Sequence, residues 1–448
     1  MVIIGAGSVC FTQGLVMDLI KNPGKCNWQL ALVDTDATAL DSITKLVKKM
    51  IQAKNADIEF SCSTDRRDVL SGSDYVISTI GVGGRRAWEQ DVFIPRKYGV
   101  YQPVGDTAMP GGISRALRMV PAIVDIVKDV KMLCPSARFL NYSNPMTVIC
   151  RAIRKALDFP VTGLCIGVPG SEWYIADFAG FERDKVTSYS IGINHLTFMY
   201  DFRYEGKDAW PAIRAKLDSV YKGDFDEKAP DRFYAENNGE AFYLGEPFAW
   251  SIFRVYNAYP APGDRHITEF FTERFPGGSY YGKTLGVDAY SFEGTIESGD
   301  KVHEERVRIA NSDTPLSDDF FNRMHGEHEQ LMDIINSIEN DSRKIFSVNT
   351  QNNGSVPNLP KDAVLEMPAA ATAKGFCPLQ INDFPDVLAG IISKYLAIAE
   401  VTVDAALKGD RKLFAEAILM GGYISDRAAV EKMADELIRA QKEYLPQF

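Results

Sequence analysis

Short runs of consecutive apolar residues recur along the first third of the chain, and helical patterns separate them. The runs are MVII (1–4), LALV (30–33), YVIS (75–78), ARFL (137–140) and VTGLCIGV (161–168). Apolar runs that do not alternate with polar residues are typical of strands covered on both faces. The pattern therefore predicts an α/β fold with a doubly wound, Rossmann-like parallel sheet.

The pattern changes at about residue 188. The segment SYSIGINHLTFMYDFRYEG (188–206) has the alternation of antiparallel strands. A turn-rich, aromatic-rich stretch of roughly 100 residues follows it. We therefore expect a Rossmann-like domain over residues 1–187 and an α+β domain that carries the substrate and metal site over residues 188–448. No Pro/Ser/Gly-rich linker separates the two.

The last part of the chain has the pattern of long helices. Residues 383–409 carry apolar side chains at helical spacing. Asp383 is the expected N-cap of this helix, and Gly409 is the expected stop.

Composition and charge narrow the class of protein. The 448 residues include 49 Lys and Arg against 60 Asp and Glu, for a net charge of -11. This balance argues against nucleic acid and anionic membranes as partners. No apolar run is long enough to span a membrane, and the first strand begins too close to Met1 for a signal peptide. Seven dispersed cysteines without a CxxC pair indicate a reducing compartment, so we expect a cytoplasmic protein.

The segment VIIGAGSVCF (2–11) predicts a dinucleotide-binding turn. One glycine makes the tight turn, and the next lets the backbone approach a pyrophosphate at a helix N-terminus. Cys10 stands where the usual fingerprint has a third glycine. An aspartate ends the second apolar run, where an acid binds the ribose hydroxyls of NAD in preference to NADP. The predicted NAD-binding residues are Gly5, Gly7, Ser8, Val9 and Asp34. The alternative is a glycine-rich turn of another α/β fold.

Cys165 and His195 are candidate metal ligands. Cys165 ends an apolar run in GLCIGV, and His195 follows in GINHLTF. Ligands of doubly wound folds bind at the carboxyl ends of the strands, where Cys165 is expected to lie. A thiolate and an imidazole form part of a coordination shell for Mn²⁺ or another divalent ion. The alternatives are a small core cysteine and a hydrogen-bonded histidine.

Six sequence blocks occur in this order along the chain: GDTAMPGGISRALRMVP, NYSNPM, GLC, GINH, GDRHITEFF and VNTQNNGSVPNLP. Together they resemble the family 4 glycoside hydrolases, from Gly5 to about Leu359. The resemblance implies an NAD- and metal-dependent glycosidase near the α-galacturonidases and α-galactosidases, with an architecture like that of lactate and malate dehydrogenases. It also implies Mn²⁺ held by Cys165 and His195, a small glycoside as substrate, and a homodimer or homotetramer.

The resemblance further implies a redox-assisted elimination. NAD⁺ oxidises the sugar 3-hydroxyl to a ketone, which acidifies the C2 proton. A base then removes that proton while the metal stabilises the enediolate. The group at C1 is eliminated, water adds, and the hydride returns to C3, without the usual pair of carboxylates.

The same resemblance assigns catalytic roles. Asp264 in GDRH matches the base at C2, with Tyr280 or Tyr281 as the alternative base. Asp106 in VGDT is the candidate acid for the leaving oxygen. The alternative for each aspartate is a turn residue.

Further polar residues are expected near the sugar. Asn144 in NYSNPM matches a residue that lines the sugar and metal site, and His266 matches a position near the sugar hydroxyls. Arg115 and Arg118 share one helical face and are either site residues or structural ion-pair residues. The other histidines lie in charged helical sequence and are expected to be solvated: His303, His325 and His328.

The predicted substrate depends on Arg265. Its planar guanidinium, beside the expected base, suits the C6 carboxylate of a uronic acid. The alternative is an ion pair with Glu269, four residues on. A 6-phosphate would need a cationic pocket, for which Arg85 and Arg86 are available, but the GDRH block favours a non-phosphorylated substrate. Ile166 departs from the polar residue expected after the metal cysteine, so a neutral α-galactoside or α-glucoside remains the alternative.

Two other functions are compatible with the first domain. An NAD-dependent 2-hydroxyacid dehydrogenase would share the dinucleotide turn, but it would need an Asp–His relay and no metal cysteine. A non-catalytic, NAD-bound sugar sensor would explain the apolar residue after Cys165. The combination of Cys165, His195 and Asp264 favours the glycosidase over both.

Overall fold

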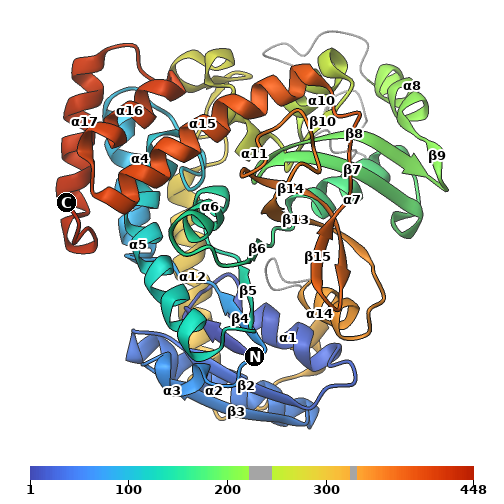
Figure 1. Cartoon of the computed structure of the whole chain (residues 1–448), viewed down its shortest axis with the longest axis vertical. Coiled ribbons are helices and arrows are strands. Elements are labelled where there is room, and N and C mark those ends of the chain that lie inside the picture. The colour runs from blue at the N-terminus through green and yellow to red at the C-terminus, as the bar shows by residue number, and fades with distance from the viewer. Residues whose placement is uncertain (221–244, 323–329) are drawn as a thin grey trace.

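The computed structural model describes residues 1–220, 245–322 and 330–448, and a large sheet runs through it (Figure 1). Strands from the first part of the chain lie in the order β3-β2-β1-β4-β5-β6, and every neighbouring pair is parallel. Their bounds are β1 (Val2–Ile4), β2 (Trp28–Val33), β3 (Ile58–Ser63), β4 (Tyr75–Ser78), β5 (Arg138–Asn141) and β6 (Val161–Gly163). This order confirms the predicted doubly wound sheet.

Helices connect these parallel strands, and a last one, α7, follows β6. They are α1 (Thr12–Lys21), α2 (Ala37–Lys54), α3 (Arg67–Leu70), α4 (Gly84–Lys97), α5 (Met109–Leu133), α6 (Met146–Leu157) and α7 (Gly167–Ala179). The first turn depends on Gly5, whose φ is +87°, because a Cβ there would lie 2.6 Å from the backbone N of Ile80. Only glycine adopts this conformation in so little space.

The second part of the chain extends the same sheet with antiparallel strands. Beyond β6 the order is β13-β14-β7-β8-β10, with β15 beside β14 and β9 beside β8. Their bounds are β7 (Val186–Ile193), β8 (Leu196–Tyr204), β9 (Lys207–Asp208), β10 (Tyr259–Ala261), β13 (Ile345–Gln351), β14 (Val364–Thr372) and β15 (Gly375–Pro378). β11 (Ser279–Tyr280) and β12 (Lys283–Thr284) form a separate pair. The expected antiparallel segment at 188–206 is thus confirmed as β7 and β8.

Helices of the second part cover this extension and reach back over the first. They are α8 (Trp210–Val220), α10 (Pro247–Tyr256), α11 (Asp264–Ile267), α12 (Phe292–Asn311), α13 (Asp318–Asn322), α14 (Leu331–Glu339), α15 (Asp386–Lys408), α16 (Arg411–Gly421) and α17 (Arg427–Ala440). Gly409, with φ of +65°, ends α15 as expected. The predicted cap is wrong. The N-cap is Pro385, and Asp383 instead accepts a hydrogen bond of 3.1 Å from the Tyr200 hydroxyl.

Both faces of the parallel sheet are buried. Val2 and Ile4 of β1 enter one apolar core together with residues of α5, α6 and α15, whereas Ile3 enters a second core with residues of α1, α2 and α14. This arrangement explains why the strands read as continuous apolar runs. In Figure 1, α15 runs across α5 and α6, against which it packs, so the two parts of the chain share a core.

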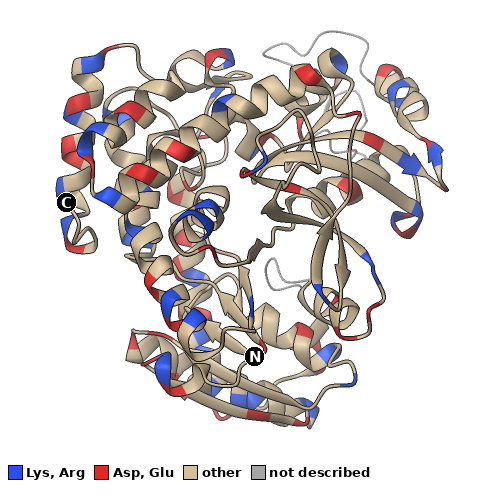
Figure 2. Cartoon of the chain, in the orientation of Figure 1, with Lys and Arg blue, Asp and Glu red and all other residues tan. Residues whose placement is uncertain are grey.

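Charged residues of both signs alternate over the outer helices, while the central strands are largely uncharged (Figure 2). No helix in the described ranges is both long enough and apolar enough to cross a membrane.

Candidate functional site

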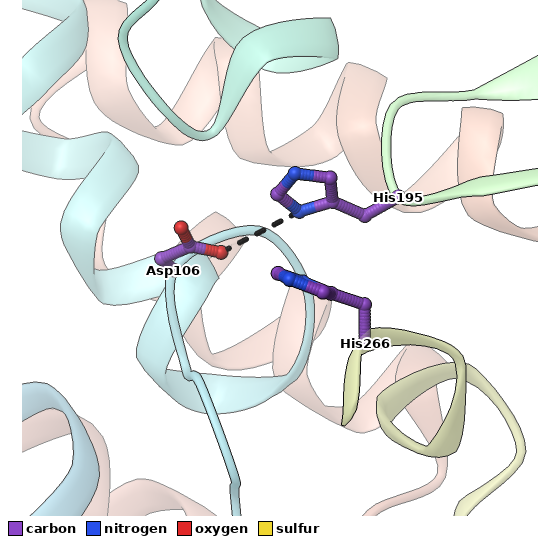
Figure 3. Close-up of side chains that lie close together, drawn as sticks. All are labelled: Asp106, His195 and His266. Carbon is purple, nitrogen blue, oxygen red and sulfur yellow. Dashed lines mark ion pairs between the residues drawn. The ribbon is translucent and has the colours of Figure 1, made fainter. Parts of the chain in front are cut away.

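Asp106, His195 and His266 form a close group of side chains that could bind a metal. Their potential ligand atoms all lie within 4.8 Å of one another. Asp106 precedes α5, His195 occupies the turn between β7 and β8, and His266 lies in α11. Figure 3 shows the Asp106 carboxylate facing the two imidazole rings, whose centroids are 4.1 Å apart.

The β7–β8 turn fixes the position of His195. His195 has a φ of +68°, which is unusual for a residue other than glycine. Gly192 pairs with Thr197 across this turn, and a Cβ on Gly192 would lie 2.1 Å from the Leu196 carbonyl oxygen. The GINH block therefore encodes a tight turn that holds its histidine in one place.

Thr107 links the aspartate to the histidine. Its hydroxyl donates to Asp106 Oδ1 at 2.7 Å and lies 2.8 Å from His195 Nδ1. Because a hydroxyl carries one proton, we infer that Thr107 accepts from Nδ1–H, which leaves Nε2 of His195 as a ligand atom. Such a partner behind a histidine is typical of metal sites. The sequence analysis missed Thr107, although it adjoins Asp106.

The surroundings of the three side chains favour the protonation states that bind a cation. Burial raises the pKa of Asp106, but His195, His266 and Arg115 lower it further, so the net pKa lies below its usual value. Burial also lowers the pKa of His195, and lowers that of His266 well below its usual value. An ionised carboxylate and two neutral imidazoles are the forms that bind divalent metals.

Asn144 completes this group on the side of β5. Its Nδ2 donates to Asp106 Oδ2 at 3.0 Å. Its Oδ1 is buried and has no hydrogen-bond partner among the described residues. Buried polar atoms are nearly always satisfied, so an unpartnered amide oxygen beside a carboxylate and two imidazoles fits a cation or a sugar hydroxyl.

The two arginines of α5 have different roles. Arg118 makes a buried, bidentate ion pair with Asp91, with distances of 3.0 and 2.6 Å. Arg115 instead donates from Nε to the backbone oxygen of Asn144 at 3.0 Å. Arg118 is therefore structural, whereas Arg115 supports the residue that binds Asp106.

Cys165 is buried at the carboxyl end of β6, where its Sγ accepts a hydrogen bond of 3.3 Å from Gly167 N–H. It is not a member of the mutually close group of Asp106, His195 and His266. Ile166, half-buried, precedes α7, and its carbonyl accepts from Gly170 N–H.

Asp264 is fully buried beneath the start of α10. It accepts hydrogen bonds of 2.8 Å from Phe248 N–H and Ala249 N–H, and one of 2.6 Å from the Tyr280 hydroxyl. Its own N–H donates to the Glu246 carboxylate. Burial raises the pKa of Asp264 to about 6 despite these donors. Tyr280 also lies 3.2 Å from the Tyr290 hydroxyl, so Asp264 ends a buried chain of polar groups.

Arg265 is not paired with Glu269. Glu269 instead accepts from Val104 N–H and Gly105 N–H at 2.8 and 2.7 Å, so it holds the loop before Asp106. Arg265 donates from Nη2 to Thr295 at 3.0 Å, and its buried Nε has no hydrogen-bond partner. Within the described ranges no carboxylate forms an ion pair with Arg265.

The remaining cationic and histidine candidates lie elsewhere. Arg85 and Arg86 both pair with Asp300, at 2.6 and 2.5 Å, so neither is a free phosphate ligand. His303 is half-buried on α12 rather than fully solvated. His325 and His328 lie outside the described residues.

The predicted dinucleotide loop is closely hydrogen-bonded. Gly5 N–H donates to the Val33 carbonyl at 2.9 Å, and Ser8 N–H donates to the Gly5 carbonyl at 3.0 Å. Gly7 N–H donates to Asp34 Oδ2 at 2.7 Å. The end of β2 is thus tied to the loop, as expected for a dinucleotide fold. Ser8 and Val9 continue the loop, and α1 begins at Thr12.

The fold and these groups define a class. A doubly wound sheet with a glycine turn carries, beyond the carboxyl ends of β4 and β5, an Asp–His–His group in which only His195 is fully buried, beside a buried amide oxygen without a hydrogen-bond partner among the described residues. This arrangement is typical of enzymes that combine a dinucleotide with a metal ion.

Comparison with known proteins gives the family. The model of the family 4 glycosyl hydrolases matches residues 1–180, and that of the family's C-terminal domain matches residues 190–421. The chain therefore belongs to the family 4 glycosyl hydrolases, a family of enzymes.

Several relatives align over nearly the whole chain. An α-galactosidase of Rhizobium meliloti is 29% identical, covering 100% of this chain and 89% of that protein. An α-glucosidase of Erwinia rhapontici is 28% identical, covering 99% and 98%. An α-galacturonidase of Thermoanaerobacterium saccharolyticum is 28% identical, covering 99% and 95%. A 6-phospho-α-glucosidase from gut microorganisms, solved with NAD and Mn²⁺, has the same fold with a TM-score of 0.82 at 18% identity, covering 100% and 99%.

Proposed function

We propose that this chain is an α-galacturonidase that uses NAD and a divalent metal ion. The observation that carries the choice of substrate is Arg265, a guanidinium with no carboxylate partner in the described structure, one residue from both Asp264 and His266. An unpaired guanidinium beside the site needs an anionic partner, and the planar fork matches a carboxylate. The α-galacturonidase relative is consistent with this substrate.

The residues of the site fit both expected cofactors. The glycine loop and Asp34 would hold NAD, while Asp106, His195 and His266 would hold the metal, with Cys165 as the further ligand that the sequence predicts. When bound, NAD supplies a reversible hydride acceptor and the metal supplies a Lewis acid. Asp106, kept ionised between two imidazoles, is better suited to binding a cation than to donating a proton.

Asp264 and Tyr280 form the proposed base as one unit. Tyr280 donates to Asp264 at 2.6 Å. The phenol oxygen can therefore take the C2 proton while its own proton passes to the Asp264 carboxylate. Asp264 is fully buried and Tyr280 is 6% exposed, so in this proposal the phenol is the end of the pair that meets the substrate.

The experiment that tests the substrate compares p-nitrophenyl α-galacturonide with p-nitrophenyl α-galactoside, in the presence of NAD⁺, Mn²⁺ and a reductant. We expect the wild type to prefer the uronide. Arg265→Lys keeps the charge but loses the fork, so it should raise KM for the uronide by about tenfold or more, as for a hydrogen bond to a charged group. KM for the galactoside should change little.

Arg274→Lys serves as the control, because Arg274 is exposed and lies in the same segment. A wild type that cleaves the galactoside readily and ignores the uronide would overturn the choice of substrate. It would favour the neutral α-galactosidase, the second candidate, to which the Rhizobium relative points.

A further inference from the structure

Arg306, in the second part of the chain, binds the dinucleotide loop at the first turn of the fold. It lies on α12, which packs against α2 and α4 (Figure 1). Its Nη1 donates to the Ser8 carbonyl at 2.5 Å, and its Nη2 donates to the Gly7 carbonyl at 2.7 Å. Only 3% of its surface is exposed.

The Arg306 guanidinium has no carboxylate partner among the described residues. Its Nε is buried and makes no hydrogen bond there. Asp34 lies near the guanidinium but forms no ion pair with it and accepts hydrogen bonds from the loop, whereas Arg85 pairs with Asp300. Buried charges in proteins are nearly always paired, so a buried guanidinium that makes no direct ion pair has positive charge to offer a bound anion.

The geometry also indicates how Arg306 acts. In a trans peptide the C=O and the following N–H point in opposite directions. Binding of the Gly7 and Ser8 carbonyls by Arg306 therefore turns the N–H groups of Ser8 and Val9 away from α12. Ser8 N–H is used by the Gly5 carbonyl, which leaves Val9 N–H as the group the loop can offer to an anion.

We propose that Arg306 is a positioning residue that makes the 5–9 loop a pyrophosphate-binding site, so that α12 completes the dinucleotide site from the other half of the chain. It orients two peptides and places a positive charge behind them. The inference rests on the NAD dependence of the proposed function, but not on the identity of the sugar. The titration below uses ligands with and without a pyrophosphate, so it distinguishes a pyrophosphate site from a site for the 2′-phosphate of NADP.

Calorimetric titration of the full chain, without sugar or metal, tests this role. NAD⁺ and ADP-ribose carry the pyrophosphate, 2′-AMP carries only the ribose phosphate, and adenosine carries neither. We expect Arg306→Met to weaken the binding of NAD⁺ and of ADP-ribose by about tenfold or more, on the scale of a charged hydrogen bond. The binding of adenosine and of 2′-AMP should weaken by less than about twofold. Arg306→Lys, which keeps the charge, should recover part of the affinity. Arg308→Met is the control, because Arg308 is exposed on the same helix and pairs with Glu305 at 2.6 Å.

Equal losses for adenosine and ADP-ribose would indicate a merely structural role, and a loss confined to 2′-AMP would indicate a 2′-phosphate site; either result overturns the proposal. If Arg306→Met does not fold, hydrogen exchange of the wild type decides. ADP-ribose, but not adenosine, should then protect the Val9 amide, and an unprotected amide would overturn the proposal. A chain that passes these tests but does not cleave galacturonide would retain Arg306's role and lose only the proposed substrate.

Discussion

At the scale of single residues, the site is built from side chains whose charge is set by their neighbours. Asp106 is held by Thr107 and Asn144, and the two histidines lower its pKa. Burial lowers the pKa of both histidines as well, so at neutral pH the three groups already have the protonation states that a metal ion binds.

Metal binding separates the candidate ligands. We expect Asp106→Asn and His195→Ala each to weaken the binding of Mn²⁺ by about tenfold or more, as is typical when a ligand or its supporting partner is lost. Cys165→Ser should also weaken Mn²⁺ if the thiolate joins the group. Electron paramagnetic resonance of free Mn²⁺ measures this, with Cys134→Ser as a buried control that lies at the end of α5. Unchanged affinity in Cys165→Ser would restrict the site to Asp106, His195 and His266.

The proposed base predicts isotope exchange. Product formed in D₂O should carry deuterium at C2, because the C2 proton passes to a protein group that exchanges with solvent. Tyr280→Phe should slow the exchange by about 100-fold, a typical effect of losing a general base. This variant is cleaner than Asp264→Asn, since Asp264 also binds two N–H groups of α10. Tyr281→Phe tests the other tyrosine named as an alternative base and should leave the exchange unchanged, and an unlabelled wild-type product, observed by NMR, would exclude the elimination mechanism.

At the scale of elements, burial at the joint between α7 and β7 makes stability depend on pH. Glu172 on α7 accepts a hydrogen bond of 2.6 Å from the Ser188 hydroxyl on β7. Burial raises the pKa of Glu172 to about 7, while this hydrogen bond opposes the shift. The folded state therefore binds a proton more tightly than the unfolded state does.

This shift has a defined sign. Below the unfolded pKa, of about 4.3, both states are protonated and the shift has no effect. As the pH rises from there to about 7, the folded chain loses stability, because it must then ionise a buried carboxyl. Glu172→Gln keeps an acceptor for Ser188 and should be more stable than the wild type at pH 8, with the difference disappearing near pH 4. Denaturant titrations measure it, with the exposed Glu182→Gln as control, and a pH-independent difference would contradict the assignment.

The elements also show which features the sequence can predict. Unbroken apolar runs predict the parallel strands, and Gly409 predicts the end of α15, because both signals are local. Asp383 is not the cap because the N-cap is Pro385, two residues on. The aspartate instead accepts a hydrogen bond from Tyr200 of β8. The sequence around Arg306 does not predict a role for this residue, because the segment KVHEERVR has the pattern of a solvent-exposed helix. Its contact with Gly7 and Ser8 depends on how α12 packs, which no local pattern encodes.

At the scale of the whole molecule, the two parts of the chain share one sheet and one core. β6 pairs with β13, and α15 packs on α5 and α6. Arg306 joins α12 to the first loop, and Glu269 joins the α11 region to the loop before Asp106. The predicted dinucleotide loop and the candidate metal group are therefore each in contact with residues from the second part.

This sharing predicts that the chain unfolds as one unit and that residues 1–187 alone do not form a stable domain. That fragment would expose the edge of β6 and the faces of α5 and α6 that α15 covers. Leu388 and Ile392 are among the α15 residues buried in that shared core. Each such buried side chain contributes about 1.5–3 kcal/mol, so losing several exceeds the typical stability of a domain. Differential scanning calorimetry of the full chain should show one cooperative transition, whereas the fragment should show none and should bind a hydrophobic dye. A fragment that melts cooperatively would show instead that α15 is dispensable for the folding of the first part. If that fragment also binds ADP-ribose as tightly as the full chain, α12 is dispensable for binding, because the dinucleotide site is then complete within the first 187 residues.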